Sequence, residues 1–245
     1  MRLRNILAAA ALLASGLASA AGGGEDLEHA NINVHDKASL QRGAAMYVNY
    51  CLGCHSMQYL RYNRLVEDLG LSEEQVDKFL VQGDQEVADP MLSAMSAEAG
   101  EEWFGIAPPD LTLTARSRGA DWIYSYLKSF YLTDEGWNNT VLPNASMPHV
   151  LWELQGIQRP ITESYTDDDG IEHSEVVDLE LDEEGKLSPE AYSDHMRDLV
   201  AFMSYAAEPA VLKREKIGIW VLLFLVAFTC LAWLLYQEFW KDVKK

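Results

Sequence analysis

A short run of residues, Cys51-Leu52-Gly53-Cys54-His55, combines two thiols and an imidazole at a fixed spacing. The pattern C-x-x-C-H is typical of covalent attachment of a c-type haem. Cysteines three residues apart lie on one face of a helical turn, so both thiols can reach the two vinyl groups of a porphyrin. The adjacent His55 can then present its imidazole to the iron from the same side. The motif therefore predicts one covalently bound haem c with His55 as an axial iron ligand.

Three other interpretations of the motif are weaker. A thioredoxin-like C-x-x-C follows a strand in a βαβ unit, and no such pattern precedes Cys51. A zinc site needs two further Cys or His ligands at fixed spacing, and none is evident near the motif. A structural disulfide across only two residues would be strained.

The opposite axial position decides the chemistry, because an open position suits gas binding or catalysis and a His or Met ligand suits electron transfer. Met147 stands in the loop Asn144-Ala145-Ser146-Met147-Pro148, between two prolines. A core methionine normally belongs to a periodic apolar face, so its loop position favours Met147 as the ligand. His149 is the second candidate. The other candidates downstream of the motif are Met91, Met95, His173, His195 and Met196.

An amphipathic helix is predicted directly before the motif. Asp36 is a plausible N-cap for it. The residues that recur at helical spacing are Leu40, Ala44, Tyr47 and Cys51. Gly43, beside Ala44, would let another helix approach closely.

A second amphipathic helix is predicted over residues 188–207, with Pro189 in its first turn and Pro209 beyond its end. Its apolar face consists of Tyr192, Met196, Leu199 and Met203. We expect this helix and the one before the motif to cross beside the cofactor.

Residues 1–20 are typical of a secretory signal peptide. Arg2 and Arg4 form a basic start, an apolar stretch follows, and Ala18-Ser19-Ala20 provides a small-residue cleavage site. We expect cleavage after Ala20, with residues 21–212 forming a periplasmic domain.

Residues 213–245 are predicted to form a C-terminal membrane anchor. The span at about 217–236 carries no charge and would make a helix of roughly 30 Å, enough to cross a bilayer. Basic residues flank it on both sides and leave the orientation open. The signal peptide decides the orientation: we expect the domain in the periplasm and the short tail in the cytoplasm. We therefore expect a single-pass protein of the bacterial inner membrane, in contact with lipid.

The chain carries 19 Lys and Arg against 38 Asp and Glu, a formal net charge of −19. This balance argues against nucleic acid as a partner, because a polyanion binds Lys and Arg. Residues 21–212 hold 11 basic and 35 acidic residues, which favours docking of a basic partner. Three cysteines are too few for a disulfide framework.

The haem motif occurs together with the signal peptide, the stretch Ala107-Pro108-Pro109-Asp110-Leu111, the Met147-Pro148 loop and one C-terminal span. In this combination the chain resembles the cytochrome c1 family, the membrane-anchored haem c subunits of the cytochrome bc1 complex. The resemblance covers essentially the whole mature chain. It implies a mainly α fold: a class I cytochrome c-like haem domain with insertions, plus one C-terminal transmembrane helix.

The resemblance also implies roles for single residues. Cys51 and Cys54 match the thioether cysteines, His55 the proximal iron ligand and Met147 the distal one. A second group matches residues around the haem: Pro109, whose carbonyl receives the Nδ1 proton of the proximal histidine; Leu111, packed on the haem; and Arg118, paired with a propionate.

What the resemblance implies about function is electron relay within a quinol–cytochrome c oxidoreductase, a proton-translocating enzyme. The haem would pass electrons from the Rieske iron–sulfur protein to a cytochrome c, next to cytochrome b, in a dimeric complex. The isolated chain would be an electron carrier without an acid, base or nucleophile site. The alternatives are a tethered monohaem cytochrome that acts alone, as a carrier or haem sensor, and a haem enzyme with an open sixth position.

Two features depart from the family pattern. Some relatives carry an extra cysteine pair in an insertion, whereas this chain has no cysteine between Cys54 and Cys230. Residues 162–184 are strongly acidic and are predicted to form a hairpin-like insertion between the Met147 loop and the last helix of the domain. No family contact is assigned to this segment.

Overall fold

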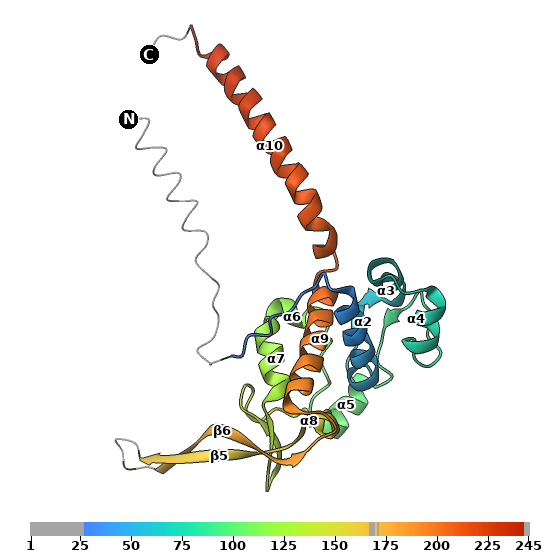
Figure 1. Cartoon of the computed structure of the whole chain (residues 1–245), viewed down its shortest axis with the longest axis vertical. Helices are drawn as coiled ribbons and strands as arrows, with labels where there is room; N and C mark the ends of the chain where they lie inside the picture. Colours follow the sequence, from blue (N-terminus) through green and yellow to red (C-terminus); the bar gives the residue numbers. More distant parts are fainter. Residues whose placement is uncertain (1–26, 167–169, 171, 243–245) are drawn as a thin grey trace.

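The structure, a computed structural model, describes residues 27–166, 170 and 172–242. The predicted signal peptide lies outside these residues. Figure 1 shows a helical body with two extensions: α10 (Val211–Phe239) leaves one end, and a ribbon of β5 (Gly156–Thr166) and β6 (Glu172–Glu184) leaves the other. About half of the chain is helical, which agrees with the predicted mainly α fold with one long apolar helix at the C-terminus.

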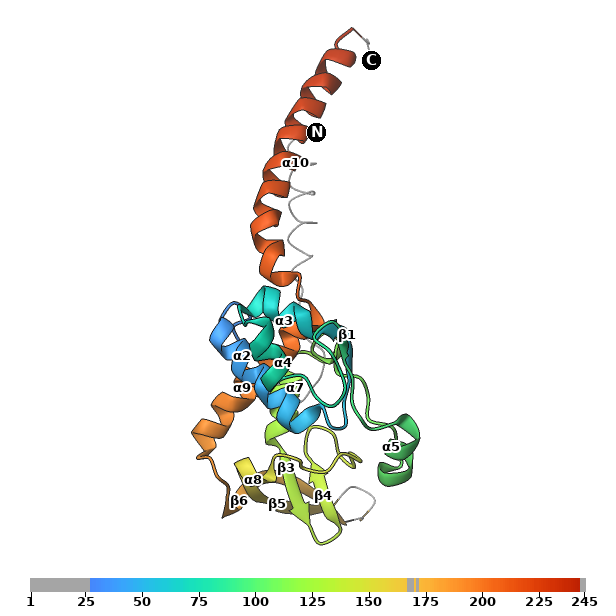
Figure 2. The same cartoon turned by 90° about the vertical axis from the view of Figure 1, so that its right-hand side faces the viewer.

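The remaining elements are short and joined by loops. In chain order they are α2 (Lys37–Met46), η2 (Tyr47–Cys51), β1 (Met57–Arg61), α3 (Tyr62–Leu69), α4 (Glu73–Phe79), β2 (Pro90–Met91), α5 (Ala97–Phe104), α6 (Thr114–Ser117), α7 (Ala120–Lys128), β3 (Phe130–Thr133), β4 (Gly136–Asn139), α8 (Trp152–Gln155) and α9 (Pro189–Ala207). In Figure 2, α5 stands out to one side of the body and the β3–β4 hairpin lies at the end opposite α10.

Helix α2 begins where the predicted cap stands. The carboxylate of Asp36 accepts hydrogen bonds from the backbone N–H groups of Ala38 and Ser39, at 3.0 and 3.3 Å, which satisfies two donors of the first turn. The predicted apolar positions of this segment are buried. The final turn differs from the expected α-helix, because it widens into the π-helix η2 that ends at Cys51.

Helix α9 follows the predicted pattern. The Ser188 hydroxyl accepts a hydrogen bond from the Ala191 backbone N–H at 3.2 Å, and Pro189 occupies the first turn, where a missing N–H costs nothing. The four residues of the predicted apolar face, Tyr192, Met196, Leu199 and Met203, are buried in the core.

Helices α2 and α9 cross in close contact, as predicted. A Cβ at Gly43 would lie 2.1 Å from the carbonyl oxygen of Asp198 and 2.7 Å from Cβ of Phe202, so only glycine allows this approach. Beside the crossing, the Arg42 guanidinium donates two hydrogen bonds to the Asp198 carboxylate, at 2.6 and 3.0 Å.

Replacing Gly43 by Ala should therefore destabilise the domain. The new methyl group meets backbone on α9 and forces the helices apart, which by analogy with other overpacked cores costs about 1–3 kcal/mol. Thermal unfolding of the haem-loaded protein in detergent measures the effect. Gly218→Ala, where no atom lies within 4 Å, is the control and should leave the transition unchanged. Equal transitions in the two variants would contradict the close crossing.

The β5–β6 ribbon is longer than the predicted hairpin-like segment. Its strands pair antiparallel from Gly156 opposite Glu184 to Thr166 opposite Glu172. The base is tied to the body, because the Gln158 side-chain amide donates to the carbonyl oxygens of Lys128 and Phe130, at 2.9 and 2.8 Å. The predicted segment includes all of β6 but only the outer part of β5, since residues 156–161 carry few charges.

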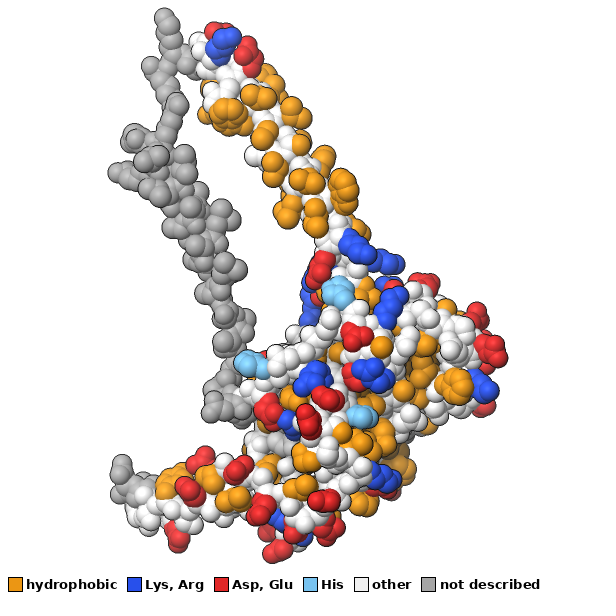
Figure 3. Space-filling view, viewed as in Figure 1, with side chains coloured by type: hydrophobic (Ala, Val, Ile, Leu, Met, Phe, Trp, Pro, Cys, Tyr) orange, Lys and Arg blue, Asp and Glu red, His pale blue; other side chains and the backbone are white. Residues whose placement is uncertain are grey.

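Helix α10 is the one described helix that is long and apolar enough to cross a membrane. It is longer than the predicted span at both ends, and its apolar side chains are exposed along its length (Figure 3). Lys213, Arg214 and Lys216 lie in its first turns, next to the body. Glu208 forms ion pairs with Arg116 of α6 and with Arg214, which links the start of α10 to the domain.

Candidate haem site

The two cysteines of the motif lie at a tight turn that closes η2. The backbone N–H groups of Cys54 and His55 both donate to the carbonyl oxygen of Cys51, at 3.1 and 2.8 Å. Both thiols are free, Cys51 buried and Cys54 half-buried. Burial raises the pKa of the Cys51 thiol to about 12, so it stays protonated at neutral pH.

His55 is held as a neutral imidazole with one nitrogen committed. Its Nδ1 lies 2.8 Å from the carbonyl oxygen of Pro109, and because a carbonyl only accepts, Nδ1 carries the proton. Nε2 is then the nitrogen with a free lone pair. Desolvation lowers the pKa of His55, partly offset by the Pro109 carbonyl, so the imidazole is neutral at pH 7. The Tyr47 hydroxyl donates to the His55 carbonyl at 2.6 Å and fixes the backbone beside it.

The segment that carries the Pro109 carbonyl is bound to the strand after the motif. The Leu111 backbone N–H donates to the carbonyl oxygen of Ser56 at 2.8 Å. The Asp110 carboxylate accepts from the N–H groups of Gln58 and Thr112, at 2.8 and 2.9 Å. Leu111 is half-buried and packs against the core. The motif and the Pro109–Leu111 turn therefore form one unit.

Helix α5 supports this turn from outside. A Cβ at Gly100 would lie 2.4 Å from Cδ of Pro108 and 3.2 Å from Cα of Ala107, so the helix contacts the proline pair directly through its glycine.

Arg118 lies between α6 and α7 and contacts a row of aromatic side chains that follows α7. Its guanidinium lies 5.0 Å from the centre of the Trp122 ring, a cation–π contact. The Trp122 ring stacks on Tyr126 at 5.1 Å with an interplanar angle of 7°, and Tyr126 meets Phe130 edge-on at 5.0 Å. Arg118 is exposed and has no carboxylate within 4 Å in the part of the chain that the structure describes. Its charge is available for a propionate.

Met147 lies in a loop that is fastened to the end of α7. The side chain of buried Asn139 donates to the carbonyl oxygen of Tyr126 at 2.8 Å and accepts from the N–H groups of Val141 and Leu142, at 2.9 and 3.0 Å. Met147 is half-buried against the core, and the Tyr126 hydroxyl donates to its sulfur at 3.4 Å. Burial raises the pKa of Tyr126 to about 12, so the hydroxyl stays protonated.

His149, the second candidate for the distal ligand, is buried between aromatic rings. It stacks on Phe130 at 4.9 Å and meets Trp137 edge-on at 5.2 Å. Desolvation lowers the pKa of His149 to about 4, partly offset by the Gln155 side chain, so the imidazole is neutral.

The other candidate ligands have different surroundings. Met91 and Met196 are fully buried in the core, His195 is exposed on α9, and His173 stacks on Tyr165 in the β5–β6 ribbon. Met95 is half-buried, and its backbone N–H donates to the Ser93 hydroxyl at 3.0 Å.

Two groups of predicted site residues border the same core. The motif, Pro109 and Leu111 form one group; Arg118 and Met147, joined through α7, form the other. Tyr192 of α9 links them, since it lies beside Cys51 and donates a hydrogen bond to the Leu127 carbonyl of α7 at 2.8 Å. Trp122 and Tyr126 were not among the predicted site residues. They follow Arg118 by four and eight residues, and this helical spacing was the available signal.

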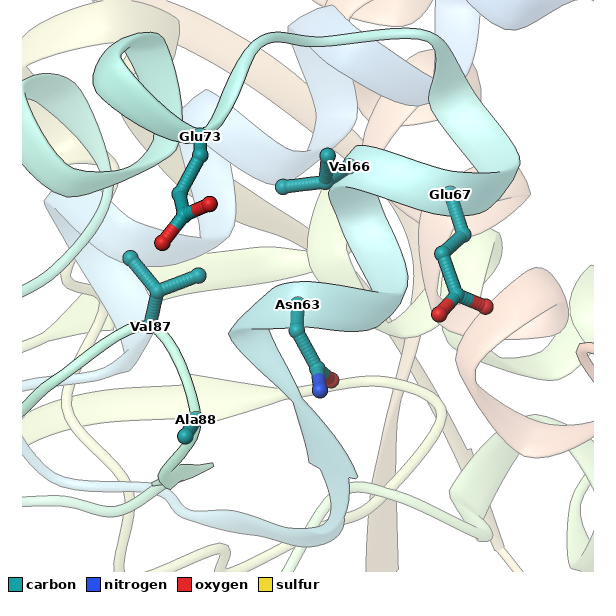
Figure 4. Close-up of a pocket in the computed structure, with 6 residues that line it drawn as sticks. All are labelled: Asn63, Val66, Glu67, Glu73, Val87 and Ala88. Carbon is teal, nitrogen blue, oxygen red and sulfur yellow. The ribbon is translucent and has the colours of Figure 1, made fainter.

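A separate pocket of about 310 Å³ lies between α3, the start of α4 and the loop before β2 (Figure 4). It is lined by Asn63, Val66, Glu67, Glu73, Val87 and Ala88. None of these is a predicted site residue.

The donor set matches a c-type haem. Two free thiols flank a turn, one imidazole nitrogen is free while the other is fixed by a carbonyl, and a thioether lies in an anchored loop. Together with α10, these features describe a c-type haem domain carried by one apolar anchor helix.

The comparisons agree with this class. The Cytochrome C1 family matches residues 28–243. Cytochrome c1 of Allochromatium vinosum is 49% identical over 97% of this chain and 98% of its own length. The ammonia monooxygenase gamma subunit of Nitrosomonas europaea is 41% identical over 99% of this chain and 100% of its own length. Cytochrome c1 of Rhodospirillum rubrum is 28% identical over 96% of this chain and 97% of its own length.

The chain belongs to the cytochrome c1 family, which confirms the resemblance noted in the sequence. The family implies haem c and electron transfer as a subunit of the cytochrome bc1 complex, an oxidoreductase, with the isolated chain an electron carrier.

Proposed function

We propose that this chain carries single electrons from a Rieske iron–sulfur protein to a cytochrome c through one haem c. The haem is bonded to Cys51 and Cys54 and ligated by His55 and Met147. The observation that carries the proposal is the 2.8 Å contact between Nδ1 of His55 and the Pro109 carbonyl beside two free thiols, because it leaves Nε2 as the metal-binding nitrogen. When bound, the haem supplies a one-electron couple between ferric and ferrous iron.

The chain's own residues hold and tune that group. Pro109 orients the His55 ring and raises the basicity of its free nitrogen. Leu111, half-buried at the same turn, excludes water. Arg118 supplies a cation that can bind a propionate in a bidentate manner. The Met147 thioether is a soft neutral ligand, which favours the ferrous state and so a high potential.

The anchor sets the location. We propose that residues 21–212 lie in the periplasm, that α10 crosses the inner membrane and that the C-terminus is cytoplasmic. Cytochrome b and the iron–sulfur protein would then contact the chain at the membrane, within a dimeric complex. Lys213, Arg214 and Lys216 at the start of α10 would then lie at the level of the lipid headgroups, where long basic side chains can keep their charges in water.

The acidic domain suits a basic acceptor. Carboxylates are spread over the surface of the body and ribbon in Figure 3, far from the anchor as well as near it. Such a field raises the rate at which a basic cytochrome c meets the domain, and the effect weakens as salt screens it.

Purification of the full chain, tagged at its C-terminus, from native membranes tests the proposal. Cytochrome b and an iron–sulfur protein should co-purify with it, and added quinol should reduce its haem. After selective removal of the iron–sulfur protein, quinol should no longer reduce the haem although dithionite still does. A haem protein that purifies alone, or with an ammonia-oxidising enzyme, would contradict the assignment.

A further inference from the structure

The row of side chains on α7 ends in a contact with the predicted distal ligand. The hydroxyl of Tyr126 donates a hydrogen bond to the sulfur of Met147 at 3.4 Å, and the Tyr126 side chain is 8% exposed. We propose that Tyr126 is a positioning residue that polarises the Met147 thioether and thereby raises the reduction potential. This inference rests on the proposed function, because it requires Met147 to ligate the iron.

The hydroxyl of Tyr126 is held toward the sulfur. Trp122 stacks on one face of the ring, 5.1 Å away and nearly parallel, and Phe130 meets the ring edge-on. The backbone of Tyr126 is tied to the Met147 loop, because Asn139 bonds to its carbonyl and to the N–H groups of Val141 and Leu142. Ring and loop therefore cannot separate easily, and no other hydrogen bond of this hydroxyl is present among the described residues.

A thioether sulfur has two lone pairs, so it can bind a metal with one and accept a hydrogen bond with the other. The bond from Tyr126 withdraws electron density from the sulfur. Ferric iron needs that density more than ferrous iron does, so the hydrogen bond weakens the ferric bond more and favours the reduced state. Trp122 stacks on the Tyr126 ring, and the Arg118 guanidinium lies over Trp122, so the predicted propionate cation and the Met147 loop both contact side chains of α7.

Tyr126→Phe removes the hydroxyl and keeps the ring. We expect the variant to retain haem and Met147 ligation while the equilibrium between ferrous and ferric iron shifts about three- to tenfold toward ferric; tenfold is about 59 mV for one electron. The affinity of the ferric protein for added cyanide should fall several-fold, because the iron–sulfur bond is stronger without the hydrogen bond. Redox titration and cyanide titration of the full chain measure the two effects.

Tyr124→Phe is the matched control. Tyr124 lies on the same helix, is buried to a similar degree and makes no hydrogen bond to Met147. This variant should leave both measurements unchanged. A merely structural role for the Tyr126 hydroxyl predicts the opposite change in cyanide binding, since a loosened Met147 loop would be displaced more easily.

The same substitution in a Met147→Leu background separates this inference from the proposed function. There the effect of Tyr126→Phe on potential should vanish. Persistence of the shift in that background, tighter cyanide binding, or an unchanged potential in Tyr126→Phe would each overturn the inference, even when Met147→Leu itself lowers the potential. If Met147→Leu leaves the potential unchanged, the ligand assignment in the proposed function fails and the inference falls with it.

Discussion

Replacing Met147 by Leu should leave the haem attached and lower its reduction potential steeply. The two thioether bonds and His55 are independent of Met147, so the cofactor stays on the chain. Loss of the soft sulfur ligand removes the preference for ferrous iron, and the expected fall is on the order of 0.1–0.3 V within the roughly 0.8 V over which axial ligands set haem potentials. The opened position should also let the reduced protein bind carbon monoxide.

Redox titration and the carbon monoxide difference spectrum measure this result. Met196→Leu is the control, because it makes the same change at a methionine that is fully buried on α9. A swap of this kind conserves volume and typically costs less than about 1.5 kcal/mol of stability. Met196→Leu should keep the potential of the unmodified protein. An unchanged potential in Met147→Leu, or an equal fall in both variants, would remove Met147 from the ligand set.

Replacing His55 by Ala should abolish accumulation of the haem-loaded protein. The iron loses its proximal ligand, and the Pro109 carbonyl loses the partner 2.8 Å away that joins the motif to the Pro109–Leu111 turn. Denaturing gels stained for covalently bound haem should show less than about a tenth of the signal of the unmodified chain, since attachment and folding of a c-type domain support one another.

His195→Ala provides the comparison for that variant. His195 is exposed on α9, and its Nδ1 is bonded only to the Ala191 carbonyl of its own helix, at 2.7 Å. Its replacement should leave the haem content unchanged. Retention of normal haem content in His55→Ala would show that another residue holds the proximal position.

The predicted helices were found where a cap adjoins an apolar repeat. Asp36 and Ser188 each precede a periodic face, and both caps are made as expected. The widening at Tyr47–Cys51 has no such local signal, because a π turn conserves the apolar spacing well enough to be read as an α-helix. The base of the β5–β6 ribbon was missed for a related reason: Gln158 is fixed by carbonyls 28 and 30 residues earlier in the chain.

The residues of the candidate site also differ in whether the local sequence could identify them. Spacing within five residues was enough to single out Cys51, Cys54 and His55. The partner of His55 lies 54 residues away, so only the resemblance to a family pointed to Pro109. Tyr126 could not be singled out from residue types alone, because a tyrosine on an amphipathic helix is usually a core residue and only the folded loop brings the Met147 sulfur to its hydroxyl.

The signal peptide and the orientation of the anchor rest on the sequence. In the structure, residues of the predicted haem site border one core. Glu208 links the start of α10 to the body through ion pairs with Arg116 and Arg214. Arg116 stands two residues from Arg118. The Glu208 ion pairs therefore bring the start of α10 close in space to the segment that carries the predicted propionate cation.

The intact mass of the mature chain, purified from membranes without reduction or alkylation, tests the central claim most directly. We expect the mass of residues 21–245 plus one haem, retained in acid and organic solvent because two thioether bonds hold it. A mass equal to that of the polypeptide alone, with Cys51 and Cys54 open to thiol reagents, would contradict the account.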